Sequence, residues 1–506
     1  MILDGGTAIQ GAAFGLTTAS ATKVTGFEVL GINDTTYGTV NLATLGAGFT
    51  NIVVGIDGIA RSATASINET PLYPTVLLDT IHSEFGTSGT DVEDITFTNV
   101  TAGTALSFNA GSAGTTTYRL ASAAGAGSAN SVTVNLGTSD SDSDTFGTLA
   151  LQGINGAVDG IATVNLVSNG YNITPGDATP AANFNNVNIT DTVITHLNVA
   201  GTQGLQLGST TTLTSTALTI GNTNTGAGLT IATLNDNSLS TLSFTGTGTT
   251  AITTLSDTIP NITLANTGTG TATVGFSSAT LTGLTLTGNV GGTFTSTNTA
   301  AVTVSGATDN AHVTLSLGAG ADTVTLGNAN NQISTGAGAD TIVAGTGKDL
   351  ITAGTGADVI TGGLGADKFV FALGDSGTPS GTVFDTITDY AKGSDVITFG
   401  ATTLVKFATA TTAISGTAGV AATTGVTSFH VNDNTLALEV TAIASALAAS
   451  AAGNALIFQF GSDSYVFVTD GASGVGADDV LIKLTGITGT DNDSLTITVG
   501  NITSLS

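Results

Sequence analysis

Six acidic or amide side chains recur at intervals of nine residues between Leu317 and Val370. The six successive turns read LGAGADTVT, LGNANNQIS, TGAGADTIV, AGTGKDLIT, AGTGADVIT and GGLGADKFV. The sixth-place residues are Asp322, Asn331, Asp340, Asp349, Asp358 and Asp367. Calcium binds about six to eight hard oxygen ligands, which it takes from carboxylates and backbone carbonyls. The spacing therefore predicts a series of calcium sites.

Glycine and apolar residues accompany the acids in the same phase. Glycine at the second and fourth places allows tight turns that aim carbonyl oxygens inward, because it has no side chain to restrict the backbone angles. The fourth-place glycines expected beside the metal are Gly320, Gly338, Gly347, Gly356 and Gly365. An apolar residue at the eighth place is typical of a short strand facing a narrow core. The eighth-place residues are Val324, Ile333, Ile342, Ile351, Ile360 and Phe369.

Two turns of nine residues make one coil of 18, so acids 18 residues apart should stack on one edge of a flattened roll. Asp322, Asp340 and Asp358 are expected on one edge, and Asn331, Asp349 and Asp367 on the other. An ion between successive loops would be shared by two acids. The site beside Asn331 is expected to be weak or empty, because an amide supplies no charge. The alternative is a glycine-rich β-coil whose aspartates only solvate the turns.

The block resembles the RTX calcium-binding nonapeptide, G-G-x-G-x-D-x-U-x. It matches at places two, four, six and eight, and departs at place one, where only Gly362 is glycine, and in the second turn, around Asn331. The resemblance implies a parallel β-roll that folds with Ca²⁺. It also implies one-step type I export with an uncleaved C-terminal signal, which is compatible with the lack of an N-terminal signal sequence here.

The composition agrees with an extracellular β-protein. The 506 residues carry a formal net charge of −28, with 36 acidic and 8 basic residues. A chain with so few basic groups is not expected to bind nucleic acid or an anionic membrane electrostatically. Cysteine is absent, so calcium would have to stabilise the fold in place of disulfides. No stretch approaches the ~20 unbroken apolar residues of a transmembrane helix.

A looser repeat precedes the nonapeptides. Apolar–polar–apolar triplets recur every 20–24 residues, and a second series of short strand-like triplets runs between them. The first series is 197–199, 218–220, 242–244, 262–264 and 284–286, and the second is 205–207, 229–231, 251–253 and 274–276. Short alternating strands at this period favour a right-handed parallel β-helix or β-solenoid that continues into the roll. A β-sandwich with similar strand spacing is the alternative.

We therefore predict an all-β chain of four regions. Residues 1–190 form a less regular β-rich domain that continues upstream of Met1 in the native protein, and 191–316 form the solenoid coils. Residues 317–370 form the calcium roll, and 371–506 form a β-rich cap with the type I secretion signal region. Within the first region, 74–85 is a candidate short helix, and the alternating acids of 139–144 form either a solvated loop or a further calcium site.

The segment after the roll contains further acids in a recurring pattern. The stretches 384–390 and 393–399 are similar to the D-x-I-x-D-[FY]…G-x-D-x-I-x-F segment that follows RTX rolls, which makes Asp385, Asp389 and Asp395 candidate ligands or turn-formers. A hairpin is expected over 457–468 and a closing strand over 478–487. This order of elements resembles the calcium-dependent surface-layer proteins of Caulobacter and its relatives, over about 317–506 only.

Catalytic motifs are missing from the sequence. The four histidines lie far apart and none belongs to an H-E-x-x-H zinc motif. The G-D-S-G stretch at 374–377 has no matching histidine context upstream. An enzyme acting on uronate polysaccharides would need cations to neutralise the substrate carboxylates, and residues 120–347 contain no Lys or Arg.

These observations predict a non-enzymatic structural protein of an extracellular surface layer, secreted and then folded by Ca²⁺. Its expected partner is a second copy of itself, in a calcium-bridged lattice or filament, with cell-surface polysaccharide as a further candidate. An RTX adhesin or extracellular filament subunit that mediates attachment is the alternative. A secreted sugar-active enzyme or hydrolase is the least favoured reading.

Overall fold

A computed structural model describes the first 130 residues as separate strands and most of the chain from Ser131 onward. The gaps after Ser131 are 137–144, 153–160, 170–183, 191–192, 214, 256–257, 377–378, 380–381, 401–403, 407–420, 424–425, 429–434, 448–450, 473, 489–494, 499–500 and 506. The chain divides into two compact units. Unit 1 contains residues 1–259 and 265–275, and unit 2 contains 260–264 and 276–506.

Unit 1 consists of short strands, each paired in parallel with the next strand but one along the chain. One sheet contains β1 (Ile2–Asp4), β3 (Val29–Asn33), β5 (Asn51–Val54), β7 (Thr75–Leu78), β9 (Ala105–Phe108), β11 (Ser131–Leu136), β13 (Thr163–Ser168), β15 (His196–Gly201), β17 (Ala217–Asn222) and β19 (Thr241–Gly246). The other sheet contains β2 (Ile9–Gln10), β4 (Thr36–Asn41), β6 (Ala65–Asn68), β8 (Ile95–Val100), β10 (Thr115–Leu120), β12 (Thr145–Gln152), β14 (Phe184–Thr190), β16 (Gly204–Leu213), β18 (Leu229–Asp236) and β20 (Thr250–Leu255). This pairing is typical of a β-solenoid, in which each coil contributes one strand to each of two parallel sheets.

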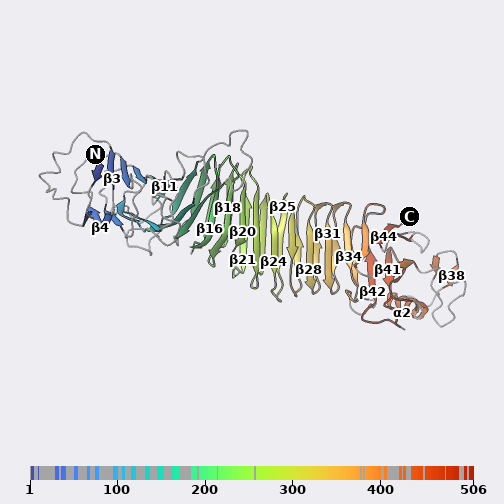
Figure 1. Ribbon diagram of the computed structural model, residues 1–506. Coiled ribbons are helices and arrows are strands. Elements are labelled where there is room, and N and C mark those ends of the chain that lie inside the picture. The colour runs from blue at the N-terminus through green and yellow to red at the C-terminus, as the bar shows by residue number, and fades with distance from the viewer. Residues whose placement is uncertain are drawn as a thin grey trace. The chain divides into compact units, whose positions relative to one another are not determined.

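In β11 and β13 buried apolar residues alternate with partly exposed polar ones, and Figure 1 shows the strands from β11 to β20 following one another along the coil. In β11 the inward residues Val132 and Val134 are fully buried, and they pair with Val164 and Leu166 of β13. The apolar side chains of each coil therefore pack against those of the next coil, and these stacked contacts form the core of the solenoid. β21 (Asn261–Asn266) and β22 (Ala272–Ser278) span the division between the units.

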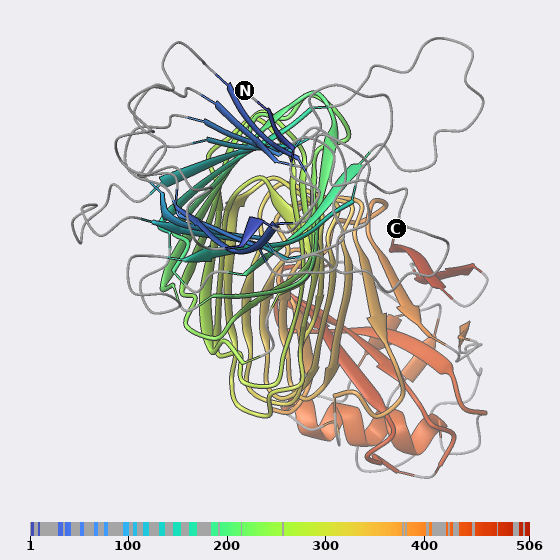
Figure 2. The same cartoon turned by 60° about the vertical axis from the view of Figure 1, so that its left-hand side comes forward.

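Unit 2 repeats this pairing with a shorter coil. One sheet contains β23 (Gly283–Gly288), β25 (Thr303–Asp309), β27 (Thr323–Thr325), β29 (Thr341–Val343), β32 (Val359–Thr361), β35 (Asp385–Ile387) and β42 (Val480–Leu484). The other contains β24 (Val290–Ser296), β26 (Val313–Ser316), β28 (Gln332–Ala337), β31 (Leu350–Thr355), β34 (Lys368–Phe371), β36 (Val396–Phe399) and β44 (Asn501–Leu505). In Figure 2 the coils of 276–370, in yellow and orange, stack directly on one another.

The register inside the roll is 18 residues. Val324 pairs with Ile342, and Ile342 pairs with Ile360, so one eighth-place residue lies above the next. All six eighth-place side chains are at most 1% exposed and fill the narrow interior. A two-stranded ladder of β30 (Thr346–Gly347) and β33 (Leu364–Gly365) extends the stacking into the turns.

A small antiparallel cap follows the roll. β40 (Asn454–Phe460) and β41 (Asp463–Val468) form the predicted hairpin, and β41 pairs with β42, the predicted closing strand, which in turn pairs in parallel with β35. The remaining strands of this region are β37 (Val405–Lys406), β38 (Ala421–Thr423), β39 (Val426–Ser428) and β43 (Leu495–Thr498).

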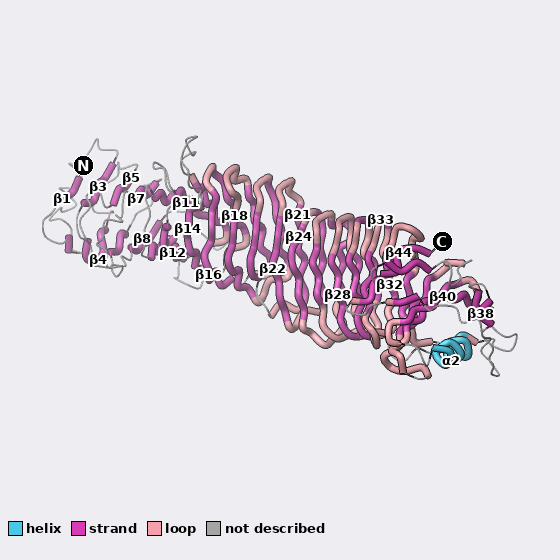
Figure 3. The backbone as a smooth tube through the Cα atoms, turned by 45° about the vertical axis from the view of Figure 1, so that its right-hand side comes forward, coloured by secondary structure: helices cyan, strands magenta, loops and turns pink. Residues whose placement is uncertain are grey.

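One helix, α2 (Leu436–Leu447), lies beside this hairpin, in cyan in Figure 3. Its Leu436, Val440 and Ile443 share a buried cluster with Phe458 and Phe467 of the hairpin. Within the described residues no helix is long and apolar enough to cross a membrane.

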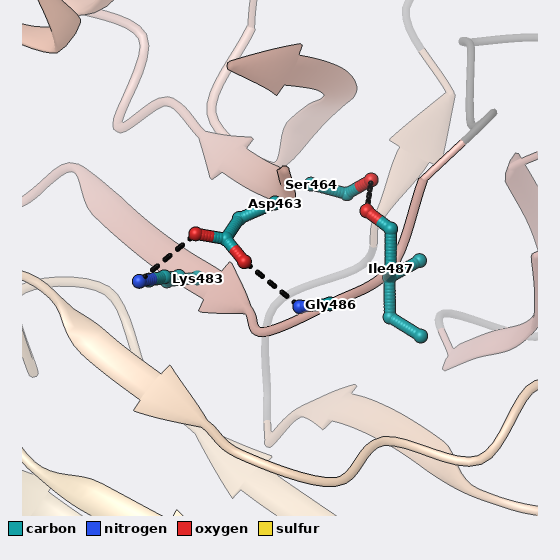
Figure 4. A network of polar contacts seen from close by, with 5 residues as sticks. All are labelled: Asp463, Ser464, Lys483, Gly486 and Ile487. Atoms are coloured by element: carbon teal, nitrogen blue, oxygen red, sulfur yellow. Dashed lines mark hydrogen bonds and ion pairs between the residues drawn. The ribbon is translucent and has the colours of Figure 1, made fainter. Parts of the chain in front are cut away.

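A polar network fixes the hairpin to the closing strand, as Figure 4 shows. The carboxylate of Asp463 lies 3.0 Å from Lys483 Nζ and accepts a 2.8 Å hydrogen bond from the Gly486 N–H. Ser464 Oγ donates to the carbonyl of Ile487 at 2.7 Å. These contacts join two segments about twenty residues apart in sequence and hold the start of β41 against the end of β42.

The prediction of an all-β solenoid with a roll is confirmed. The first triplet series lies on β15, β17, β19, β21 and β23, and the second on β16, β18, β20 and β22. Parallel next-but-one pairing rules out the β-sandwich alternative for these coils. The helix predicted over 74–85 is wrong for Thr75–Leu78, which form strand β7 with β-branched and leucine residues that pair with β5 and β9, and the rest of that span lies outside the described residues. The acids of 139–144 lie outside the described residues, and the division into four regions stays a prediction.

Candidate metal centre

The acids of one edge are joined by a ladder of hydrogen bonds, here called ladder 1. The Asp322 N–H donates to Asp340 Oδ1 and the Asp340 N–H donates to Asp358 Oδ1, both at 2.8 Å. The ladder continues at its ends, because the Val302 N–H donates to Asp322 Oδ1 at 2.7 Å and the Asp358 N–H to Asp385 Oδ1 at 3.0 Å. Each acid therefore has one oxygen engaged by the preceding coil.

The other edge carries ladder 2, built in the same way. The Asn331 N–H donates to Asp349 Oδ1 at 2.7 Å, and the Asp349 N–H to Asp367 Oδ1 at 2.9 Å. At the ends, the Val313 N–H donates to Asn331 Oδ1 at 3.1 Å and the Asp367 N–H to Asp395 Oδ1 at 3.0 Å. The structure thus places the six sixth-place residues in two stacks of three, on the edges expected from their spacing.

The fourth-place glycines allow the turns to stack this closely. Gly338 has φ +145° and Gly356 has φ +149°, which is a region that favours glycine. A Cβ on Gly338 would overlap the carbonyl oxygen of Gly320, and one on Gly356 would overlap that of Gly338. Gly347 and Gly365 repeat the arrangement on the other edge. Successive turns therefore bring backbone carbonyls close to one another beside the acids.

The second oxygen of these acids shows whether a cation fits. Oδ2 is buried and has no hydrogen-bond partner in each of the following residues: Asp322, Asp340, Asp349, Asp358, Asp367 and Asp385. A buried carboxylate oxygen without a donor or cation is strongly destabilising, because it has lost its water. The ladders leave one such oxygen in five of the six turns, the turn of Asn331 being the exception, and the stacked glycines of these turns face backbone carbonyls of the preceding coil. That donor set, all hard oxygen and partly anionic, suits Ca²⁺.

The pKa values of the buried aspartates also favour a bound cation. Burial raises the pKa of Asp322 and Asp349 to about 6, that of Asp358 to about 7 and that of Asp385 to about 8. The negative charge of the next acid on the same edge adds to the shift, since Asp340 raises the pKa of Asp322 and Asp367 that of Asp349. Without a cation Asp358 and Asp385 would be incompletely ionised near neutral pH. A bound Ca²⁺ would reverse this preference by compensating the charge.

Asn331 differs from the acids around it. Its Nδ2 donates to the carbonyl of Ala344 at 3.3 Å, so the second side-chain atom is satisfied inside the protein. The amide N–H here occupies the role that a cation would take beside an aspartate. This contact gives a physical reason for the expectation that the Asn331 site is weak or empty.

The acids after the roll behave differently from one another. Asp389 accepts the N–H groups of Gly362 and Gly363 with its two oxygens, at 3.0 and 2.7 Å. Asp395 accepts the Asp367 N–H on Oδ1 and the Ala391 N–H, at 2.8 Å, on Oδ2. Asp389 and Asp395 use both carboxylate oxygens to accept backbone N–H groups, whereas Oδ2 of Asp385 has no hydrogen-bond partner. A ligand role for Asp389 and Asp395 therefore stays a prediction, with weaker support than for Asp385.

Asp236, Asp309 and Asp375 are among the buried acids that were not predicted from the sequence. Asp375 is 8% exposed, and its charge contributes to the raised pKa of both Asp358 and Asp385. Asp236 and Asp309 each have a buried Oδ2 with no hydrogen-bond partner. None of the three is in phase with the nonapeptides, so the spacing gave no signal for them. Across the described residues no three His, Cys, Asp or Glu side chains converge as a metal cluster.

Comparison with known proteins agrees with this geometry. Residues 314–342 and 334–369 match the family model of the RTX calcium-binding nonapeptide repeat (4 copies). A search of curated proteins found no match to the chain. The matched segments contain ladder 1 from Asp322 to Asp358 and ladder 2 from Asn331 to Asp367. The stacked turns of this RTX-type protein are therefore RTX nonapeptide repeats, which bind calcium.

Proposed function

We propose that this chain is a secreted structural protein of an extracellular surface layer, which folds and self-assembles with bound Ca²⁺ after export. The observation that carries the proposal is the row of buried carboxylate oxygens, one in every turn except that of Asn331, that have no donor inside the protein. They make the roll dependent on an ion from outside. In this proposal the calcium-dependent part is the roll, and the solenoid coils and the cap provide the surfaces that contact other subunits.

Calcium would act first as a folding switch. Ligand that binds only the folded state adds its binding free energy to stability, by about 3 kcal/mol per site at a concentration of 100 times Kd. Extracellular calcium modules bind with constants of order 10⁻⁴ to 10⁻³ M. In a cytosol with much less calcium the roll would stay unfolded and ready for export. RTX repeat proteins typically leave the cell by type I secretion, and we assign this route to the chain.

Calcium would act a second time between subunits. A formal charge of −28 per chain makes copies repel one another, and a divalent cation that bridges surface acids removes that repulsion. The outward faces of the coils carry mostly short polar side chains, such as Thr303 and Ser305 on β25, which are exposed. Faces of this kind suit a repeating contact with another copy. A cell-surface polysaccharide is the proposed anchor.

The test uses the full-length chain, purified after chelation and returned to millimolar Ca²⁺ or to Mg²⁺ as a control. Circular dichroism should show β-structure that forms with Ca²⁺ and not with Mg²⁺, and electron microscopy should show two-dimensional sheets. Calcium-dependent folding without sheets, with filaments or single particles bound to cell surfaces, would favour the adhesin alternative. Unchanged circular dichroism on chelation would overturn the proposal.

A further inference from the structure

Asp309 is a buried acid that lies before the first nonapeptide and outside the matched residues 314–369. It is the last residue of β25, which is labelled in Figure 1, and it is 2% exposed. Its Oδ1 accepts the N–H groups of Val290, at 3.0 Å, and Ala311, at 3.3 Å. Its Oδ2 is buried and has no hydrogen-bond partner. The side chain therefore leaves one anionic oxygen uncompensated.

Two asparagines in unit 1 show how the same local position is satisfied elsewhere. Asn222 and Asn266 also end a strand, and their Oδ1 atoms accept the N–H two residues further on, at 2.9 and 3.0 Å. Each then donates from Nδ2 to a backbone carbonyl, Asn222 to Thr249 at 2.7 Å and Asn266 to Gly270 at 2.8 Å. At the ends of these two strands the second polar atom of the side chain, Nδ2, is therefore a donor that is satisfied by a backbone carbonyl.

Asp309 has an oxygen where those asparagines have a donor. An ionised carboxylate cannot donate a hydrogen bond. Asn331 makes the same comparison inside unit 2, because its Nδ2 also donates to a carbonyl, that of Ala344. In the aspartates of the roll the matching oxygen is bare, as in Asp309. Asp309 therefore resembles the aspartates of the roll, whose Oδ2 has no partner, and differs from the asparagines, whose Nδ2 donates to a carbonyl.

The backbone next to Asp309 is also rich in oxygen. The carbonyl oxygens of Gly306 and Ala307 lie 2.9 and 3.0 Å from the point where a Cβ on Gly327 would be, and the carbonyl of Asp309 lies closer still. The carbonyls of Gly306 and Ala307 therefore approach a glycine that has no side chain to fill the space, while the Asp309 carbonyl accepts the Asn328 N–H at 3.0 Å. Mixed carboxylate and carbonyl oxygen is the environment that Ca²⁺ prefers.

We propose that Asp309 is the anionic ligand of a further calcium site, one coil before the RTX repeats, in which the cation takes the part of the amide N–H beside Asn222 and Asn266. Carbonyls of the 306–309 segment are the neutral ligands at hand. The site would extend the ion-dependent part of the protein beyond the nonapeptide motif and would tie β24 to the second turn of the roll. It stands on the local geometry and does not require assembly into a surface layer.

The test compares the full-length protein with Asp309→Asn and Asp309→Ser in millimolar Ca²⁺. Asparagine supplies the donor used at Asn266, and serine supplies a single acceptor like Ser278 and Ser296, whose Oγ atoms accept the N–H two residues on at 3.2 Å. Both variants are thus designed to keep the corner folded. Native mass spectrometry should find one fewer bound calcium in each, with unchanged circular dichroism in Ca²⁺.

The outcomes separate this site from the repeats. Asp340→Asn, made in parallel, should also bind one fewer ion, because it removes a ligand of ladder 1. If Asp340→Asn loses an ion while both folded Asp309 variants bind as many as the parent, the proposal is overturned and Asp309 is held neutral by a proton. If the parent protein binds no calcium at all, the proposed function fails together with the site.

Discussion

The backbone N–H of Asp340 donates a 2.8 Å hydrogen bond to Oδ1 of Asp358, eighteen residues further along the chain. One carboxylate therefore serves two neighbours: Oδ1 holds the preceding coil in register, and Oδ2 is left for a cation. Protein and ion share each side chain, so the metal sites cannot form before the coils stack. This relationship explains why folding and calcium binding should occur as one event, and it makes the following predictions concrete.

Replacing Asp340 with asparagine should separate the two roles. Asn keeps the oxygen that accepts the Asp322 N–H and adds an amide that can donate to a carbonyl, as Asn331 does. We expect the variant to lose about 3 kcal/mol of calcium-dependent stabilisation at a calcium concentration of 100 times Kd, and to give the same circular dichroism as the parent in chelator. Thermal unfolding at several calcium concentrations measures the first, and spectra in chelator measure the second. Asp478→Asn, at an exposed acid, is the charge-matched control and should change neither quantity.

The reverse change, Asn331→Asp, should create a site. The new carboxylate loses the hydrogen bond to Ala344 and gains a bare buried oxygen like those of its neighbours. At the lowest calcium concentration that still folds the parent, unfolding should shift to a lower temperature, while millimolar Ca²⁺ should restore or exceed the parent value, with one more ion bound. Asn330→Asp adds the same charge at an exposed position and should do neither. An unchanged ion count for Asn331→Asp would contradict the assignment of ladder 2.

Adding a single methyl group at Gly338 should disrupt the roll. The residue has φ +145°, and a Cβ would overlap the carbonyl oxygen of Gly320, so backbone strain and a steric clash combine. We expect Gly338→Ala to cost several-fold more than the roughly 1–2 kcal/mol of a left-handed residue alone. Gly393→Ala provides the comparison, because Gly393 has φ +78° with nothing within 4 Å of the added atom. Equal losses of unfolding free energy would show that the stacked turns have room.

Protons should compete with calcium. In the ion-free protein the raised pKa values of Asp322, about 6, Asp358, about 7, and Asp385, about 8, exceed the value of about 4 in an unfolded chain. The folded state then binds more protons than the unfolded state between pH 4 and 8. Chelated protein should therefore become more stable as pH falls through this window, and less stable as pH rises.

In calcium the dependence on pH should have the opposite sign. The ion binds only the ionised carboxylates, so the calcium concentration at the folding midpoint should increase as pH falls from 8 to 5. Chemical denaturation at fixed ionic strength, with and without Ca²⁺, tests both curves. A midpoint independent of pH would show that the acids with raised pKa values are not the ligands.

The phase of the nonapeptides was enough to predict much of this structure. Acids nine apart gave the two edges, and the eighth-place residues gave the core, because a regular coil turns sequence distance directly into position. Asn331 stood out for the same reason. The triplets of 197–286 predicted strands correctly, since each alternates buried and outward residues.

Features outside a repeat could not be predicted in this way. Asp309 is buried by contacts with Val290, nineteen residues away, which no local pattern signals. The helix α2 has mostly alanine and leucine in a chain rich in strands, and its packing against Phe458 and Phe467 depends on distant residues. At 74–85 the local residues favoured a helix, but pairing with β5 and β9 decided the outcome.

The 18-residue register has a consequence for how the length of this chain can change. Every acid in the roll contacts the residue one full coil away, from Asp322 to Asp340 to Asp358. A deletion of 18 residues keeps each remaining acid on its own edge, whereas a deletion of nine moves every later acid to the opposite edge, and a deletion of one turns core residues outward. A gene for this protein can therefore gain or lose 54 nucleotides in one event and still encode a continuous roll.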